Sequence, residues 1–156
     1  MPSESDTDYL RLDSQLSALM SGETDPLANA ANCVALLFHA LPRINWLGIY
    51  LARDDELVLG PFQGKAACTR IAFGRGVCGR AAESRQTQLV DDVHDFDGHI
   101  ACDPDSRSEL VVPLITGNTL IGVLDIDSPE PARFGDADRL GGVHPAIHLP
   151  FQYLYP

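Results

Sequence analysis

The chain has 156 residues, of which 45% are hydrophobic, and its 11 basic and 22 acidic side chains give a net charge of -11. This length suits one globular domain, so we expect residues 1–156 to form a single domain with its core at about residues 8–148. The acidic balance argues against nucleic acid and anionic membrane surfaces as partners, because both attract basic proteins.

The start of the chain predicts a cytoplasmic protein. Its first twenty residues include Glu4, Asp6, Asp8 and Asp13 and lack the basic start and apolar run of a signal peptide. The apolar runs are too short to span a bilayer. Because cytoplasmic thiols are kept reduced, we expect the four cysteines to be inert, metal-binding or catalytic. A framework of two structural disulfides is the less favoured alternative.

A first helix is predicted from Asp6 to Met20. Ser5 and Asp8 resemble a capping box, in which two side chains bond to the first backbone N–H groups of a helix. The apolar side chains recur at near-helical spacing, which indicates one buried face. This predicted face consists of Leu10, Leu12, Leu16 and Leu19.

A second helix begins at Asp25-Pro26, which supplies an N-cap and a proline at the first helical position. It ends before Pro42. Cys33 lies beside its apolar stripe and is predicted to be a small buried hydrophobe without a role in the chemistry. The predicted stripe consists of Leu27, Ala31, Val34, Phe38 and Leu41.

The rest of the chain predicts a mainly antiparallel sheet with a short helix at Gly76–Ser84. A closing helix, made irregular by glycines and prolines, is expected from Asp136 to Ile147. Helices at the ends of such a sheet give an α+β fold. The polar loop from Asp91 to Ser106 contains Cys102, and long loops are usually lids or binding segments. Strands are predicted at residues 46–52, 56–62, 69–73, 88–93, 109–115 and 119–127.

Three of the four cysteines, Cys68, Cys78 and Cys102, fall within 35 residues, which indicates thiol chemistry. A zinc site made by these thiols and a histidine is the alternative. It is less favoured because the spacing lacks the paired CxxC or HxxxH that brings two ligands together in structural zinc sites. We therefore predict no metal.

The segment Gly74-Arg75-Gly76-Val77-Cys78-Gly79 matches the glycine pattern of dinucleotide-binding folds. That pattern requires a buried parallel strand before it and a full crossover helix after it. Here the preceding segment, Thr69–Phe73, alternates in polarity, and the following helix is short. We interpret the glycines as a tight strand-to-helix turn.

Trp46 and Tyr50 share one face of a predicted strand, with Gly48 between them. They are either ordinary core residues or the wall of a binding pocket. Gly48 favours the pocket, because its missing side chain is expected to leave room for a ligand.

Asp125 and Asp127 also share one strand face, and strands disfavour aspartate, so the pair marks either a solvated strand end or a site. Gly117-Asn118 forms the hairpin turn that joins this strand to the preceding one. With strictly regular pairing, Glu109 lies opposite Ile126 and points away from both aspartates. A three-residue loop or a bulge would instead place Glu109 opposite Asp127, so a site with three carboxylates requires an irregular hairpin.

Six motifs along residues 8–140 together resemble the free methionine-(R)-sulfoxide reductases, small enzymes with the GAF fold. Each motif alone is weak, but their order and the cysteine spacing are specific. The motifs are Asn45-Trp46-Leu47-Gly48-Ile49-Tyr50, Leu59-Gly60-Pro61-Phe62-Gln63-Gly64, Gly74-Arg75-Gly76-Val77-Cys78-Gly79, Gly98-His99-Ile100-Ala101-Cys102-Asp103, Ser108-Glu109 and Leu124-Asp125-Ile126-Asp127-Ser128.

The resemblance implies a GAF-like α+β fold, in which a central six-stranded antiparallel sheet carries the N- and C-terminal helices on one face. It assigns Cys102 as the nucleophile, Cys68 as the main resolving thiol and Cys78 as a secondary redox cysteine. Two further groups are implied: Trp46 and Tyr50 around the methyl end of the substrate, and Glu109, Asp125 and Asp127 around its polar end and the sulfoxide oxygen.

The implied reaction reduces free methionine sulfoxide through a Cys102 sulfenic acid and a Cys68–Cys102 disulfide. Thioredoxin or a similar dithiol, itself reduced by NADPH, would restore the thiols, and no bound cofactor is expected. A homodimer is a possible assembly. The alternatives are a GAF module that only binds a small molecule and a thiol redox sensor without a sulfoxide substrate.

Overall fold

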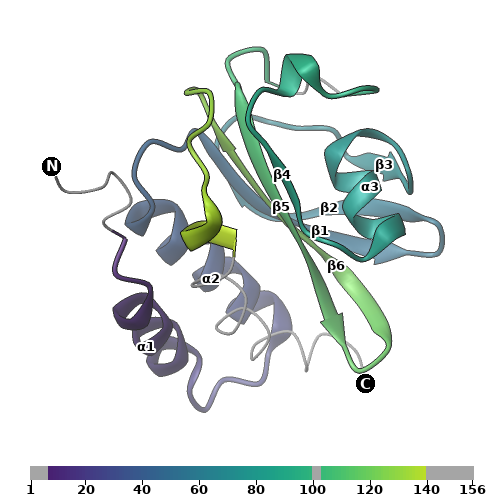
Figure 1. The fold of residues 1–156 in the computed structure, drawn as a ribbon. Coiled ribbons are helices and arrows are strands. Elements are labelled where there is room, and N and C mark those ends of the chain that lie inside the picture. The colour runs from purple at the N-terminus through teal and green to yellow at the C-terminus, as the bar shows by residue number, and fades with distance from the viewer. Residues whose placement is uncertain (1–6, 100–102, 140–156) are drawn as a thin grey trace, which may run out of the picture.

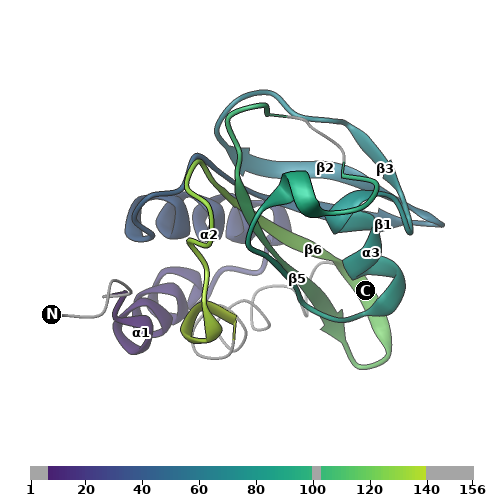
Figure 2. The same ribbon diagram turned by 45° about the horizontal axis from the view of Figure 1, so that its top comes forward.

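The computed structural model describes residues 7–99 and 103–139. Six strands form one antiparallel sheet in the order β3-β2-β1-β6-β5-β4, which confirms the predicted α+β fold. Helices α1 and α2 lie on one face of the sheet and α3 on the other (Figures 1 and 2). The elements are α1 (Tyr9–Met20), α2 (Pro26–Ala40), β1 (Trp46–Arg53), β2 (Glu56–Gln63), β3 (Arg70–Ala72), α3 (Gly76–Ser84), β4 (Gln88–Val90), a 3-10 turn η1 (Val93–Asp95), β5 (Ser108–Thr116) and β6 (Thr119–Ser128).

Helix α1 starts later than predicted. The Asp8 carboxylate accepts a hydrogen bond from the Arg11 backbone N–H at 3.1 Å, so Asp8 is the N-cap itself and not the third residue of a capping box. The buried side chains are Leu12, Leu16 and Met20. Leu10 and Leu19, which were predicted to be in the core, are 83% and 44% exposed.

Helix α2 has the predicted cap, in which Asp25 accepts from the Ala28 N–H at 2.8 Å, and the predicted end. Its buried face is rotated relative to the prediction, and Leu27 is 64% exposed. The reason is that this helix is apolar on several sides, so its contact with the sheet selects the face. Cys33 is fully buried as predicted, and burial raises the pKa of its thiol to about 12. The buried side chains of α2 are Asn29, Ala30, Cys33, Val34 and Leu37.

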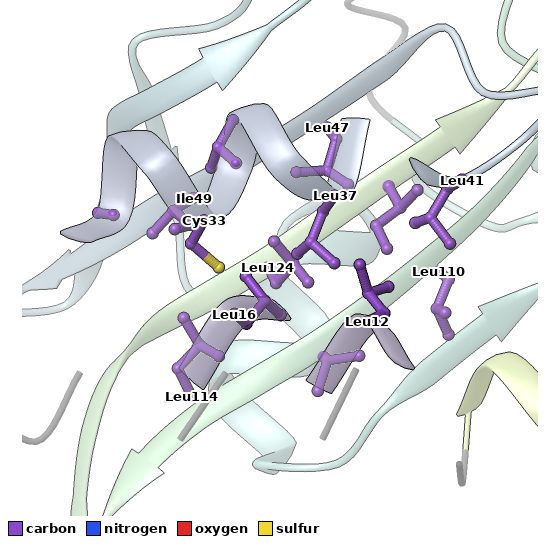
Figure 3. Close-up of a cluster of buried hydrophobic side chains, with 14 of the residues drawn as sticks. Leu12, Leu16, Cys33, Leu37, Leu41, Leu47, Ile49, Leu110, Leu114 and Leu124 are labelled. Atoms are coloured by element: carbon purple, nitrogen blue, oxygen red, sulfur yellow. The ribbon is translucent and has the colours of Figure 1, made fainter. Parts of the chain in front are cut away.

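Alternation along the central strands sends successive side chains to the two faces of the sheet. On one face, leucines and isoleucines of β1, β5 and β6 pack against α1 and α2, and Figure 3 shows the Cys33 sulfur among these carbon side chains. On the other face, residues of the same strands pack against α3. In β1, for example, Leu47 and Ile49 face α1 and α2, whereas Trp46 and Tyr50 face α3.

The β5–β6 hairpin is irregular in the way that a three-carboxylate site requires. Thr116 pairs with Thr119 across the Gly117-Asn118 turn, as predicted for a two-residue loop. The register then shifts between Leu114 and Ile115, so that one extra residue of β6 is accommodated. Beyond this bulge Glu109 lies opposite Asp127.

The end of the described chain packs on the same side as α1 and α2. Phe134 joins their core cluster, and the Tyr9 hydroxyl donates to the Asp138 carboxylate. Residues 136–139 form a helical turn, and the rest of the predicted closing helix lies outside the described residues. Strand β4 ends at Val90, earlier than predicted, because η1 follows it. No helix in the two described ranges has the length and apolar character needed to cross a membrane.

Candidate active site

A pocket lies on the α3 side of the sheet, between β1, β5, β6, the start of α3 and two loop segments. Its loop residues include Lys65, His99 and Asp103. The other lining residues that matter here are Trp46, Tyr50, Cys78, Glu109, Asp125 and Asp127. The sheet register explains this grouping, because two rows run across the strands. One row consists of Trp46, Asp127 and Glu109, and the other of Gly48, Asp125 and Val111.

The three carboxyl groups at this site are withdrawn from water, and two of them, on Glu109 and Asp125, are each only 6% exposed. Burial is the largest cause of a raised pKa in each, and the charge of Asp125 raises the pKa values of Glu109 and Asp127 further. Hydrogen bonds from Glu109 and Cys78 oppose the rise at Asp125. Asp125 is therefore the most readily ionised of the three, and the other two retain protons at higher pH.

One oxygen of Asp125 has no hydrogen-bond donor within the described part of the chain. This atom, Oδ1, is fully buried. A buried carboxylate oxygen without a partner is costly, so a donor from a ligand would be strongly favoured there.

The Cys78 thiol completes the carboxyl cluster. Its Sγ donates to Oε1 of Glu109 at 3.9 Å, and burial followed by the charge of Asp125 raises the pKa of this thiol well above its ordinary value. Cys78 is therefore a neutral thiol at pH 7 in this state. Donor atoms of Cys78, Glu109 and Asp125 lie within 4.8 Å of one another, close enough to hold a metal ion together.

His99 lies beside the same cluster, with Nε2 at 3.9 Å from Oε2 of Glu109. Burial lowers the pKa of His99 and raises that of Glu109, so both shifts favour the neutral forms. Both shifts therefore weaken the ion pair that these two groups would otherwise form.

The aromatic wall of the pocket is a stack of three rings. Trp46 stacks on Tyr50 with centroids 6.0 Å apart, and on Phe62 with centroids 5.4 Å apart. The expectation that Gly48 leaves room for a ligand was wrong. A Cβ atom at that position would lie 2.4 Å from the Trp46 ring, so the indole itself occupies the space. Phe62 was not singled out in the sequence, although it lies in a motif of the family resemblance.

Both pocket aromatics also bind the backbone of the loop that carries Cys68. Trp46 Nε1–H donates to the carbonyl of Lys65, and the Tyr50 hydroxyl donates to the carbonyl of Cys68, each at 2.9 Å. Burial raises the pKa of Tyr50, as does the nearby charge of Asp125, so this hydroxyl keeps its proton. These hydrogen bonds could not be predicted from the sequence, because they join side chains of β1 to backbone atoms of the loop between β2 and β3.

The same loop reaches the segment that follows Cys102. The Lys65 ammonium lies 3.0 Å from a carboxylate oxygen of Asp105 and 3.8 Å from one of Asp103. Cys68 is disulfide-bonded, whereas Cys33 and Cys78 are free thiols. Cys102 lies outside the described residues.

The glycine pattern before α3 forms a strand-to-helix turn, as interpreted from the sequence. Gly74 and Gly76 have positive φ angles of 82° and 63°, and a Cβ on Gly79 would lie 2.6 Å from the carbonyl oxygen of Ala72. Strand β3 is short and pairs antiparallel with β2. These features differ from a dinucleotide-binding unit, which requires a parallel strand.

Residues 29–140 match the GAF domain family. The chain is 58% identical over 133 residues to the free methionine-R-sulfoxide reductase of Escherichia coli, covering 85% of this chain and 81% of that relative. The chain belongs to the free methionine-R-sulfoxide reductase family. The enzyme of that name from Saccharomyces cerevisiae is 45% identical, covering 78% of this chain and 72% of the relative.

Solved structures of this reductase family share the fold. The reduced form of the Staphylococcus aureus protein is 44% identical, with a TM-score of 0.86 over 99% of this chain and 97% of that one. The Neisseria meningitidis reductase in complex with its substrate is also 44% identical, with a TM-score of 0.83 over 94% of this chain and 85% of that one.

Most of the predicted site residues of this reductase fold come together. The pocket contains Trp46, Tyr50, Cys78, Glu109, Asp125 and Asp127, and the Cys68 carbonyl bonds to Tyr50 at its edge. His99 and Asp103, which flank the segment containing Cys102, line the same pocket. The catalytic and binding roles of these residues stay predictions.

Proposed function

We propose that this protein reduces free L-methionine-(R)-sulfoxide to methionine in the cytoplasm, with thioredoxin as the reductant. The observation that carries this proposal is one pocket in which an aromatic wall faces a cluster of buried carboxyl groups. Membership of the reductase family supports the same activity. The pocket lies beside Cys68 and beside residues that flank Cys102, so sulfur nucleophiles and proton donors serve one substrate.

The substrate is a zwitterion, and the pocket offers a site for each end. Asp125 Oδ1 receives the ammonium group, because it is buried and otherwise without a donor. The α-carboxylate lies at the start of α3, where Gly76, Val77 and Cys78 line the pocket. The N-cap of this helix provides no side-chain hydrogen bond, so its first N–H groups and dipole favour an anion. A methionine sulfoxide within a peptide lacks both charges.

The methyl group and the sulfoxide lie against the ring stack. Trp46 and Tyr50 present apolar surface to the methyl group, while the sulfoxide oxygen points to the protonated carboxyl cluster. Glu109 donates a proton to this oxygen, because burial and the charges of its carboxylate neighbours raise its pKa and favour the protonated form. Asp127 lies opposite Glu109, and its charge helps to keep the proton on Glu109.

In the first chemical step, the Cys102 thiolate attacks the sulfoxide sulfur. Glu109 gives a proton to the oxygen, the sulfur–oxygen bond of the sulfoxide breaks, and the oxygen is transferred to Sγ of Cys102. Methionine leaves with two more electrons, and Cys102 is oxidised to a sulfenic acid. Binding of the substrate ammonium neutralises the charge of Asp125 and so lowers the cost of forming this thiolate. Rapid alkylation of Cys102 at mildly acidic pH in the substrate-free protein would contradict that step.

In the second step, the Cys68 thiol attacks the sulfenic sulfur, forming a disulfide and releasing water. Thioredoxin then reduces the disulfide by thiol exchange, and NADPH reduces thioredoxin through its reductase. Cys78 serves as a secondary redox thiol. The cycle requires no bound cofactor, because the electrons come from thiols throughout.

The deciding experiment measures NADPH consumption with thioredoxin, thioredoxin reductase and free methionine-(R)-sulfoxide. We expect turnover by the wild-type protein and by a Cys33→Ser control, and none by Cys102→Ser or with the (S) epimer. Folded, reduced protein that binds methionine sulfoxide without turnover would instead establish a binding module. Peroxide-driven oxidation of Cys68 without sulfoxide turnover would establish a redox sensor.

We also propose that the protein forms a homodimer. Leu10 of α1 and Leu27 of α2 are 83% and 64% exposed, and the proposed interface would cover both. Sedimentation of the full chain measures the mass directly. A monomer at micromolar concentration would contradict the proposal.

A further inference from the structure

The loop that carries Cys68 is attached to the pocket wall at two points. The indole of Trp46 bonds to the carbonyl of Lys65, and the hydroxyl of Tyr50 bonds to the carbonyl of Cys68. Gly64 makes the first attachment possible, because its φ is +128° and a Cβ there would lie 2.5 Å from the Trp46 ring. The same aromatic side chains thus contact the pocket and hold the redox loop.

A third attachment joins this loop to the segment after Cys102. The Lys65 ammonium bridges to Asp105 and Asp103. Asp103 is itself held, because its Oδ1 accepts from the Asp105 N–H at 2.9 Å. Asn45, the residue before β1, contacts Ser106 at 3.3 Å. Two connections that are distant in sequence are therefore fixed to each other and to β1.

We propose that Tyr50 and Lys65 are positioning residues for the second step of the cycle, in which Cys68 attacks the sulfenic acid of Cys102. Tyr50 fixes the backbone of Cys68, and Lys65 fixes that loop against the segment following Cys102. A sulfur–sulfur bond forms, the sulfenic oxygen leaves as water with two protons, and no external oxidant enters. This assignment rests on the proposed reductase cycle and adds residues that act through Cys68.

Disulfide formation depends strongly on such fixation. A disulfide requires a narrow range of distances and dihedral angles, and a thiol on a freely moving loop samples them rarely. The hydrogen bond from Tyr50 is present while Cys68 is disulfide-bonded. Removal of the Tyr50 hydroxyl should therefore slow the approach of Cys68 more than it affects the bound substrate.

The test separates the two steps in a single turnover without thioredoxin. Reduced protein is mixed with methionine-(R)-sulfoxide and quenched at intervals, and methionine and the remaining free thiols are measured in each sample. For Tyr50→Phe, we expect the ratio of the disulfide rate to the methionine rate to fall about fivefold, the effect of one typical hydrogen bond. The Cys102 sulfenic acid should then accumulate and react with a dione trap.

Two controls distinguish positioning from general damage. Tyr9→Phe removes another hydroxyl with a hydrogen bond, but on the opposite side of the sheet, and should leave the ratio unchanged. Lys65→Glu and Asp105→Lys should each lower the ratio about twofold to fourfold, and the double exchange should restore most of it. A loss caused only by misfolding would not be recovered by exchanging the two charges.

The outcomes are distinct. Equal slowing of methionine and disulfide formation in Tyr50→Phe would limit Tyr50 to the substrate pocket and overturn the inference. An unchanged ratio in the Lys65 and Asp105 variants would overturn the role of Lys65. Absence of methionine formation in the wild-type protein would refute the proposed function itself, independently of either ratio.

Discussion

Gly48→Ala is the substitution for which the structure gives the clearest energetic prediction. The added Cβ would lie 2.4 Å from Cη2 of Trp46 and 2.6 Å from Cβ of Phe62, both well inside ordinary van der Waals contact. The indole cannot simply move aside, because it is stacked on the rings of both Tyr50 and Phe62. The strand and the ring stack must therefore shift together.

The size of the effect follows from two opposing contributions. Overpacking of a well-packed site costs about 1–3 kcal/mol, and the two close contacts with rigid neighbours place this site near about 3 kcal/mol. Replacing glycine by alanine in a strand returns about 1 kcal/mol through a lower entropy of the unfolded chain. The expected loss is about 2 kcal/mol, or roughly 4–8 °C in Tm for a chain of this size.

Urea unfolding followed by tryptophan fluorescence measures this loss of stability. The signal comes from the ring stack itself, because Trp46 is the only tryptophan in the chain. We expect a lower midpoint, a shifted native emission spectrum and a higher KM for methionine sulfoxide. Gly135→Ala is the control, because nothing lies within 4 Å of its added Cβ, and it should change stability by less than about 0.5 kcal/mol. Equal stabilities of the two variants, with the native emission of Gly48→Ala unaltered, would refute the ring-stack reasoning.

Three further predictions concern protons, caps and thiol reactivity. Burial raises the pKa of Glu109, so above the ordinary pKa of 4.5 the folded state binds more protons than the unfolded state. Stability should therefore fall as the pH rises towards the raised pKa. Glu109→Gln should flatten that fall when urea unfolding is measured at several pH values. Asp25→Ala removes the N-cap of α2 and should cost about 1 kcal/mol, measured in the same way, with a loss below about 0.3 kcal/mol speaking against the cap. Cys33 should resist alkylation near pH 8 until the protein unfolds, since its thiol pKa is about 12 and its side chain is fully buried; mass spectrometry that finds it modified in native protein would contradict this burial.

Local patterns predicted the elements well but predicted their faces less well. Asp25-Pro26 and the bounds of α3 were correct, because caps and glycine turns depend on nearby residues. The exposed Leu10 and Leu27 were assigned to the core, because α1 and α2 carry apolar residues on more than one side. Only the contact with the sheet determines which side is buried, and that contact depends on residues far along the chain.

The site shows the same limit at the level of register. The sequence left open whether Glu109 lies on the same face as Asp125 and Asp127, because this depends on whether the hairpin is regular or irregular. The structure has a bulge, and Glu109 lies opposite Asp127. No local signal fixed its position, because a bulge depends on how both strands pack. The mistaken role of Gly48 has a different cause: the side chain that fills its space belongs to Trp46, two residues earlier, whose ring packs on Tyr50 and on Phe62 of the neighbouring strand.

The bulge also links the stability of this fold to its proposed chemistry. Regular pairing would place Glu109 opposite Ile126, on the face that packs against α1 and α2, where an acid would be buried among leucines. The extra residue of β6 instead places Glu109, Asp125 and Asp127 on one face, where burial and the charge of Asp125 raise the cost of ionising Glu109 and Asp127. This cost reduces stability as the pH rises, but it also favours a carboxyl proton that can be given to a sulfoxide oxygen. A variant that stabilised the fold by removing one of these acids would therefore be expected to lose the proton donor or the ammonium site. Glu109→Gln tests both effects in one protein, because its stability should depend less on pH and its sulfoxide reduction should be slower.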